Sequence, residues 1–157
     1  MEARFSADRT LGRLVKWLRI LGYDTALRRR DRDRDFLTEA AEEGRIALTR
    51  KRDLARLPYQ GRLVVVRADR SGEQLGEVLE ALNLNPDPAK RMSRCLLCNA
   101  LLEEVPKEAV NGLVPAYVHE RCAQFRRCPL CGKLFWPGTH PQRIEEYLRT
   151  RIPRRQA

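Results

Sequence analysis

Two C-x2-C pairs constrain this chain of 157 residues more than any other feature. Cys95-Leu-Leu-Cys98 is followed by Asn99, and Cys128-Pro-Leu-Cys131 is followed by Gly132. Two such pairs supply the four thiolate ligands of a tetrahedral structural zinc ion. The residue after each second cysteine fits this interpretation. The tight turn that a C-x2-C pair makes around the metal, called a knuckle, ends in a left-handed backbone conformation that Gly adopts freely and Asn tolerates. The sequence therefore predicts one zinc site.

The alternatives to zinc are two disulfides or a set of unrelated buried thiols. Disulfides need an oxidising compartment, and residues 1–5 lack the apolar core of a signal peptide, so we expect a cytoplasmic protein. Cys122 lies outside both pairs and is expected to be a free or half-buried thiol. His119 is expected to be a structural or surface residue, because four cysteines already complete the tetrahedron.

The segment between the two pairs is 29 residues long, which exceeds the usual spacing of this motif. Pro106, Pro115 and the Asn111-Gly112 dipeptide provide breaks, so we expect a long antiparallel hairpin within a zinc ribbon. Because such a ribbon buries little apolar area and depends on its metal, the main core must lie before residue 90.

Before residue 85, short apolar segments alternate with segments of helical periodicity. We expect strands at 4–7, 23–27, 45–49 and 63–66, and helices at 11–21, around Phe36 up to Gly44, at 54–57 and at 72–82. An aspartate before Phe36 is expected to cap its helix. This alternation predicts an α/β fold with a parallel sheet. We expect an α/β domain at 1–84, a proline-containing linker at 85–92, a ribbon at 93–140, and a short helix with a basic tail at 141–157.

The charge balance points to a polyanionic partner. Lys and Arg number 31 against 21 Asp and Glu, which gives a formal net charge of +10. Nucleic acid is the first candidate for such a protein. A membrane surface is the second, but the sequence has no apolar run of about 18 residues, and its basic residues are scattered over several elements.

Acidic residues follow the first three expected strands. Asp8 ends the first strand, Asp33 and Asp35 start the helix after the second, and Asp53 follows Thr49 beyond the third. Carboxyl ends of parallel strands share the edge where ligands bind, so these acids are candidate ligands of Mg²⁺ or Mn²⁺ for phosphodiester hydrolysis. Helix capping explains several of them equally well, and alternating Arg and Asp over residues 28–35 is typical of a solvated loop.

Several ordered motifs resemble one known family over about residues 4–148. They are Phe5-Ser-Ala-Asp8, Leu11-Gly-Arg-Leu14, Trp17-Leu-Arg19, Leu21-Gly-Tyr-Asp-Thr25, Gly44-Arg-Ile-Ala-Leu-Thr-Arg50, the two cysteine pairs, Phe135-Trp136 and Gly138-Thr-His140. Together they resemble the Mut-seven C-terminal RNase domain family, in which a PIN-like nuclease fold carries a zinc ribbon. In that family an aromatic residue usually stands at the position of Cys122. The resemblance therefore implies that the Cys122 thiol is not a zinc ligand.

The resemblance implies ribonuclease activity at an acidic metal centre. Asp8 matches the family's first-strand acid, which would be the central metal ligand, and Asp33 matches the acid before the second helix. The family pattern after the third strand resembles Thr-Arg-Asp, whereas this chain has Thr49-Arg50-Lys51. An ammonium group does not ligate Mg²⁺ and repels it at close range, so Asp53, or Asp24 from its turn, would have to replace the missing carboxylate.

Two functions compete on this sequence. The first is a metal-dependent ribonuclease in which Asp8, Asp33 and Asp53 hold Mg²⁺ or Mn²⁺ and Thr49 positions a phosphate or a water. The second is a catalytically impaired RNA-binding protein in which Lys51 replaces the metal by a fixed positive charge. A DNA-binding regulator is a weaker alternative, because no helix-turn-helix is predicted.

Residues for RNA contact are expected on both predicted domains. The candidates for phosphate contact are Arg13, Lys16, Arg50, Lys51, Arg126, Arg127 and Lys133. Phe135 and Trp136 are candidates for stacking on a base, with packing in the ribbon's small core as the alternative.

Overall fold

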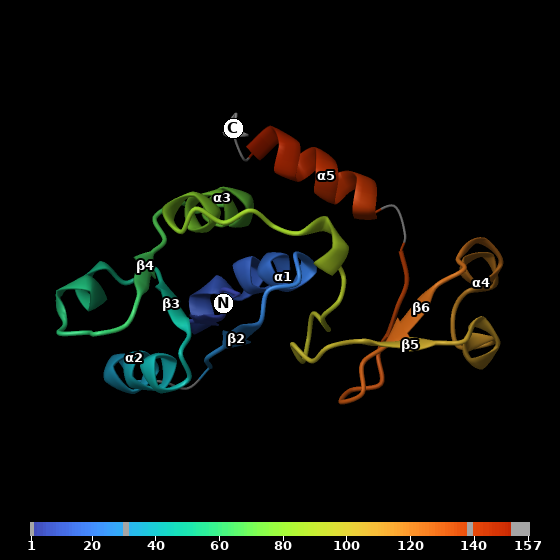
Figure 1. Cartoon of the computed structure of the whole chain (residues 1–157), viewed down its shortest axis with the longest axis horizontal. Coiled ribbons are helices and arrows are strands. Elements are labelled where there is room, and N and C mark those ends of the chain that lie inside the picture. Colours follow the sequence, from blue (N-terminus) through green and yellow to red (C-terminus); the bar gives the residue numbers. More distant parts are fainter. Residues whose placement is uncertain (1, 30–31, 138–139, 152–157) are drawn as a thin grey trace. The chain divides into compact units, whose positions relative to one another are not determined.

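The computed structural model describes residues 2–29, 32–137 and 140–151. The chain divides into two compact units, residues 1–99 and residues 100–157, and Figure 1 labels most of their helices and strands. Arg30 and Asp31 of the charged loop, residues 138–139 of the last motif and residues 152–157 of the basic tail lie outside the described residues. Within the described part of the chain, no helix is both long and apolar enough to span a membrane.

The first unit is built on a four-stranded parallel sheet. Its strands are β1 (Phe5–Ala7), β2 (Thr25–Leu27), β3 (Ile46–Thr49) and β4 (Leu63–Val65), in the spatial order β2-β1-β3-β4. Phe5 of β1 pairs with Thr25 on one side and Ile46 on the other. Every residue of β1 and β3 is buried, as expected for central strands covered on both faces. The predicted α/β fold with a parallel sheet is confirmed.

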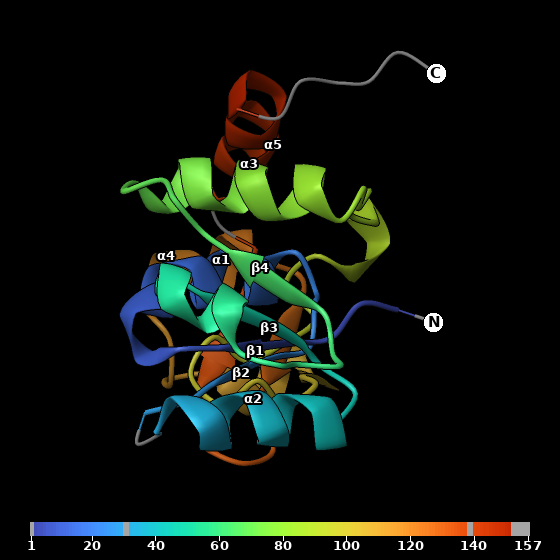
Figure 2. The ribbon, with the colours of Figure 1, turned by 90° about the vertical axis from the view of Figure 1, so that its left-hand side faces the viewer.

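Helices cover both faces of this sheet. In Figure 2, α1 (Gly12–Ile20) and α3 (Ser71–Ala81) lie on one face and α2 (Asp33–Glu42) lies on the other. Short 3-10 helices follow at η1 (Arg9–Leu11), η2 (Arg52–Arg56) and η3 (Pro88–Lys90). On the α2 face, Phe36 and Leu37 pack with Ala47 and Leu54 in one buried cluster. This packing fixes the start of α2 beside the sheet.

The start of α2 differs from the prediction. The N-cap residue is Arg32, and no side chain caps the helix, while Asp33 and Asp35 lie inside the first turn. The expectation that an aspartate caps this helix is therefore wrong. Negative charge in the first turn still stabilises the positive end of the helix dipole, which explains why these acids suit the position without making a cap.

The second unit contains a three-stranded antiparallel sheet, β5 (Glu103–Val105), β6 (Phe125–Arg127) and β7 (Leu134–Phe135), in that order. The expected hairpin is present as the β5–β6 pair, but its connection is helical, with η4 (Lys107–Val110) and α4 (Ala116–Arg121). Val110, Val114, Val118 and Phe125 form a small buried cluster under this connection. The chain continues in α5 (His140–Arg151).

Candidate functional site

The carboxyl edge of the parallel sheet brings β1 and β3 together at a topological switch point. The chain leaves β1 for β2 on one side, while β3 continues to β4 on the other. In sheets of this kind, ligands bind outside the strand ends at such a point. Asp8 directly follows β1, and its backbone N–H donates to the Leu48 carbonyl of β3 at 3.0 Å. The predicted first-strand acid therefore lies at the position where a ligand is expected.

Neutral donors hold the Asp8 carboxylate. Its Oδ1 accepts hydrogen bonds from the backbone and hydroxyl of Thr10, and its Oδ2 accepts from the Thr49 hydroxyl at 2.6 Å and from the Arg50 backbone N–H at 3.2 Å. Partial burial disfavours the charged form, but these hydrogen bonds outweigh it and lower the pKa of Asp8. Asp8 also caps η1, as the capping alternative for this residue predicted. The carboxylate stays charged and is not neutralised by these partners.

A cleft of about 430 Å³ opens beside Asp8. It is lined by Asp8, Arg9, Thr10, Arg28, Arg29, Arg32, Asp33, Phe36, Lys51 and Leu54. Figure 2 shows that the turn after β1 and the start of α2 lie at the same end of the sheet. Asp33, in the first turn of α2, thus shares the cleft with Asp8, while the buried side chains of Phe36 and Leu54 give it an apolar wall.

Lys51 lies among the acids that were predicted to bind a metal. Its ammonium group donates a short hydrogen bond to the Asp33 carboxylate, and both side chains are partly exposed. The hydrogen bond to Asp33, followed by the negative charges of Asp33, Asp8 and Asp53, raises the pKa of Lys51. A positive charge therefore stands within the electrostatic reach of all three carboxylates.

The remaining predicted residues of this site lie apart from the cleft lining. Thr49 is fully buried, and its hydroxyl connects Asp8 to the backbone N–H of Lys51, which donates to it at 3.1 Å. Asp53 is an exposed residue in the first turn of η2 and does not line the cleft. Asp35 is exposed on α2, and Asp69 forms an exposed ion pair with Arg50 at 2.6 Å. Of these acids, Asp8 and Asp33 share the cleft.

Asp24 lies at the opposite, amino edge of the sheet, just before β2. Its carboxylate accepts from Arg45 at 2.6 Å, from the side-chain amide of Asn99 at 2.7 Å and from Arg4 at 3.3 Å. Burial alone would raise its pKa, but these hydrogen bonds and the nearby guanidinium charges lower the pKa of Asp24 to about 2. The sequence did not predict this network, because its partners are 20 to 75 residues away along the chain.

The two cysteine pairs converge as predicted. The Sγ atoms of Cys95, Cys98, Cys128 and Cys131 all lie within 4.8 Å of one another. Zn–S bonds of about 2.3 Å imply sulfur separations of about 3.8 Å around a tetrahedral ion, so this cluster is compatible with zinc. Among the residues that the structure describes, no comparable group of three carboxylates accompanies it. Cys122 is not part of the cluster, and its thiol lies 3.5 Å from the Pro137 carbonyl.

The two knuckles have the same local backbone geometry. Asn99 and Gly132 adopt positive φ angles of 67° and 75°, as the sequence predicted, and each donates its N–H to the carbonyl of the first cysteine of its pair at 2.9 Å. The N–H of Cys98 points to the Cys95 sulfur and that of Cys131 to the Cys128 sulfur, at 3.4 and 3.5 Å. Donors aimed at sulfur stabilise thiolates, so the residues fit a metal centre.

Arg19 supports the first knuckle and was missed as a functional residue. It is 7% exposed, and it donates to the Thr25 carbonyl at 3.0 Å and to the Leu96 carbonyl inside the knuckle at 2.7 Å. A signal was present in the sequence, because position 19 falls on the same helical face as the buried Val15. An arginine on a buried face must find hydrogen-bond partners.

The predicted RNA contacts differ in exposure. Arg13 and Lys16 are exposed on α1, and Arg126 and Arg127 are half-buried on β6. Lys133 lies over the Phe135 ring, 5.8 Å from its centroid. Trp136 packs against the buried cluster of the second unit, which favours the core alternative for this side chain. Of the seven predicted basic residues, Lys51 lines the cleft and the others do not.

His119 takes a structural role. Its Nε2 lies 3.0 Å from the Lys107 carbonyl, and its ring stacks on Phe125 with centroids 6.3 Å apart. The first contact joins α4 to η4 within the helical connection, and the second ties this connection to β6 of the sheet. His119 is not part of the cysteine cluster, in line with its predicted structural or surface placement.

Comparison with protein families gives a match that covers nearly the whole chain. The family model described as Mut7-C RNAse domain matches residues 3–148. Neither the curated proteins nor the solved structures gave a significant match. The matched span includes the acid-lined cleft and all four clustered cysteines.

Proposed function

Because the chain belongs to the Mut7-C RNAse domain family, we propose that it is a metal-dependent ribonuclease that hydrolyses the phosphodiester bonds of RNA. The observation that carries this proposal is the pair of carboxylates, Asp8 and Asp33, that line one open cleft at the carboxyl edge of the sheet. Open clefts at that edge are where ligands bind in parallel α/β sheets. The formal net charge of +10 suits a polyanionic substrate.

Asp8, Asp33 and Asp53 would hold Mg²⁺ or Mn²⁺, because carboxylate oxygens are the ligands that these ions prefer. A bound ion would supply an activated water and charge stabilisation at the leaving oxygen. Thr49 orients the Asp8 carboxylate and is proposed to position a water or a phosphate through that carboxylate. The Lys51 side chain is 50% exposed, so it is free to rotate into solvent and release Asp33 for ligation.

We propose that Cys95, Cys98, Cys128 and Cys131 bind a structural zinc ion in a ribbon that aids RNA binding. The four sulfurs and the N–H groups aimed at them support this part of the proposal. In this view the nuclease domain ends near residue 84, and the ribbon spans 93–140 after a linker at 85–92. Phosphate contacts would come from Arg13, Lys16, Arg50, Lys51, Arg126, Arg127 and Lys133.

The Lys51–Asp33 ion pair favours a second candidate function, an RNA-binding protein whose metal site is impaired. A lysine ammonium neutralises a carboxylate without providing a Lewis acid or a site for an activated water. If Lys51 stays in place, the cleft keeps a fixed positive charge for phosphates and lacks hydrolytic chemistry. The two candidates therefore differ in cleavage and agree in RNA binding.

The deciding experiment is cleavage of end-labelled single-stranded RNA by the purified protein, with Mn²⁺ or Mg²⁺ either added or omitted. The divalent ions are left out of the buffer instead of being removed with a chelator, because a chelator also removes zinc from thiolate sites. Asp8→Asn is the test variant. Asp69→Asn is the matched control, because the Asp69 side chain is 91% exposed and lies outside the cleft lining.

Cleavage that requires the added ion, disappears in Asp8→Asn and persists in Asp69→Asn would support the ribonuclease. RNA binding without cleavage in the presence of either ion would instead select the impaired RNA-binding protein. Equal cleavage by the wild type and Asp8→Asn would contradict the role of the acidic cleft in both schemes.

A further inference from the structure

The cleft is lined by more positive than negative side chains. Its five cationic groups, on Arg9, Arg28, Arg29, Arg32 and Lys51, face the two carboxylates of Asp8 and Asp33, an excess of three positive charges. The sequence predicted a solvated loop over residues 28–35. Arg29 and Arg32 of this segment are exposed, and they also line the cleft beside the candidate acids.

Two of the five cations already have acidic partners. Arg28 forms ion pairs with Glu39 at 3.3 Å and with Glu43, and Lys51 pairs with Asp33. The other carboxylate of the cleft, Asp8, is occupied by neutral donors. Neither carboxylate of the cleft therefore forms an ion pair with the remaining cations, and the excess of positive charge persists.

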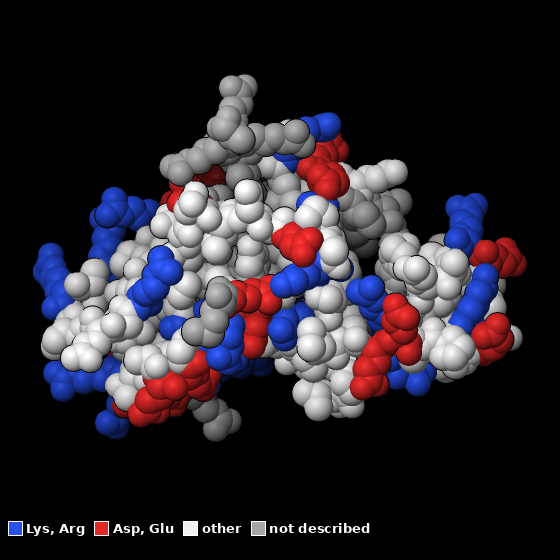
Figure 3. All heavy atoms as spheres, viewed as in Figure 1, with Lys and Arg blue, Asp and Glu red and all other residues white. Residues whose placement is uncertain are grey.

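Arg9, Arg29 and Arg32 are those remaining cations, and none of them forms an ion pair with a described residue. All three are exposed, and they reach the cleft from two elements, η1 after β1 and the chain before α2. Figure 3 shows acidic and basic side chains interspersed on the face that it draws, so net charge alone does not mark a path for RNA. Cations that have no ion-pair partner among the described residues and converge on one cleft are a more specific signal.

A phosphate group matches this arrangement. A guanidinium group presents a planar fork of donors that binds phosphate oxygens in a bidentate manner, and it remains charged at any physiological pH. The buried Phe36 and Leu54 wall limits solvent on one side, which strengthens charge interactions in the cleft. A volume of about 430 Å³ lies at the lower end of the range for small-ligand pockets.

We infer that Arg9, Arg29 and Arg32 form a phosphate subsite that positions the RNA strand beside Asp8. This inference rests on the proposed function and names the part of the substrate that the cleft recognises. The three arginines are positioning residues that contact a phosphate next to the acidic centre, and they bind it without a divalent ion. The phosphate is either an internal phosphodiester or a terminal 5′-phosphate.

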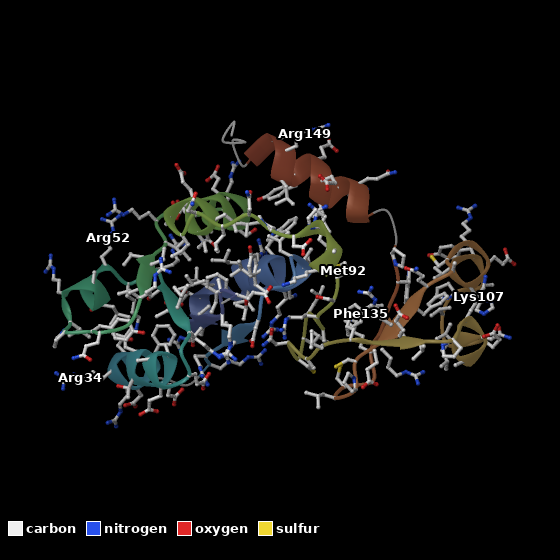
Figure 4. All side chains as sticks on the ribbon, viewed as in Figure 1. Arg34, Arg52, Met92, Lys107, Phe135 and Arg149 are labelled. Carbon is white, nitrogen blue, oxygen red and sulfur yellow. The ribbon has the colours of Figure 1, made fainter. Side chains whose placement is uncertain are left out.

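The test measures binding instead of cleavage. A 3′-labelled oligoadenylate, with either a 5′-phosphate or a 5′-hydroxyl, is titrated with the full chain by fluorescence anisotropy at several salt concentrations and without divalent ions. The test variant is the double substitution Arg29→Ala with Arg32→Ala. The matched control is Arg34→Ala, because Arg34 is an exposed residue of the same helix start whose side chain points away from the first unit (Figure 4) and does not line the cleft.

The double variant is expected to bind at least about tenfold more weakly, and Arg34→Ala within about twofold of the wild type. The magnitude of the slope of log affinity against log salt should fall by about 0.7 in the double variant, because the subsite neutralises one phosphate and each neutralised phosphate of a single strand contributes about 0.7. A loss of stability alone would not change this slope. Unchanged affinity and slope in the double variant would overturn the subsite.

The two RNA ends identify the source of the phosphate. If the wild type prefers the oligonucleotide with the 5′-phosphate and the double variant loses this preference, the subsite binds the terminal phosphate. If the double variant loses the same affinity for both oligonucleotides, the subsite binds an internal phosphodiester. The design also separates this inference from the proposed function. If the wild type cleaves RNA in an ion-dependent way and the double variant binds RNA as well as the wild type, the subsite is refuted and the ribonuclease is kept. If the double variant loses RNA binding and the wild type never cleaves RNA, the subsite is kept and the ribonuclease is refuted.

Discussion

The two edges of the parallel sheet hold aspartates in opposite ways. At the amino edge, Asp24 is surrounded by the guanidinium groups of Arg45 and Arg4 and by the Asn99 amide. At the carboxyl edge, Asp8 is held by two hydroxyls and two backbone N–H groups, which carry no net charge. Both carboxylates have lowered pKa values, but the charge is neutralised at Asp24 and remains available at Asp8.

The difference separates a structural acid from a candidate ligand. Cationic partners cancel the field of a carboxylate, so Asp24 offers little to an incoming cation. Neutral donors fix the orientation of Asp8 while its negative charge still attracts a cation. Substitutions at the amino edge should therefore change stability, and substitutions at the carboxyl edge should change metal binding or activity.

The largest expected effect concerns the cysteine knuckle whose Asn99 side chain contacts Asp24. Cys95→Ser should abolish zinc binding and lower the melting temperature strongly, because structural zinc in small peptides contributes about 10 kcal/mol or more of apparent binding free energy. Metal analysis and thermal unfolding measure both. Cys122→Ser is the control, since this thiol lies outside the cluster. Full zinc content in Cys95→Ser would refute the four-cysteine site.

The next effect is the loss of the main cation at the amino edge. Arg45→Met should lower the free energy of unfolding by about 3 kcal/mol, because it leaves the Asp24 carboxylate partly buried without its closest partner. The side chains of this pair are 11% and 21% exposed. Arg50→Met is the matched control, whose pair with Asp69 is solvent-exposed and should contribute less than about 1 kcal/mol. Equal losses in urea unfolding would refute the contrast between the edges.

A smaller effect follows from the lowered pKa of Asp24, which is about 2 in the folded protein against an ordinary value of 3.8. The folded state binds this proton less readily, so the carboxylate contributes stability above about pH 4 and loses it as the pH falls towards 2. After allowance for solvent screening, we expect this contribution to the free energy of unfolding to be about 1–2 kcal/mol. The difference in unfolding free energy between the wild type and Asp24→Asn should shrink by that amount from pH 5 to pH 2. A difference independent of pH would contradict it.

Local features were predictable from the sequence, and long-range ones were not. The two knuckles were predictable from the two-residue spacing within each cysteine pair. The left-handed conformation at Asn99 was predictable because asparagine tolerates positive φ angles. The second role of Asn99, its contact with Asp24, joins residues 75 positions apart and leaves no periodic signal. The helical connection of the second unit was missed because α4 has six residues, too few to show a helical period.

The same limit applies to the candidate site. Asp8 and Asp33 were predicted from strand order, because parallel strands bring their carboxyl ends to one edge. Arg28, Arg29 and Arg32 were interpreted only as part of a solvated loop, because alternating charges are typical of such a loop. Their true partners depend on the tertiary fold: Arg28 reaches across to Glu39 and Glu43, and Asp33 pairs with Lys51.

The last predicted effect is on metal affinity and concerns Lys51, the residue on which the two candidate functions differ. Lys51→Asp replaces a cation by a carboxylate within the reach of Asp8, Asp33 and Asp53, so Mn²⁺ should bind at least about tenfold more tightly, which corresponds to about 1.4 kcal/mol. Lys51→Met removes the charge without adding a ligand and should give a smaller gain. Titration followed by the Mn²⁺ paramagnetic resonance signal measures both affinities. Equal Mn²⁺ affinity in the wild type and Lys51→Asp would place Lys51 outside the metal shell, and the impaired-site function would then lose the observation that favours it.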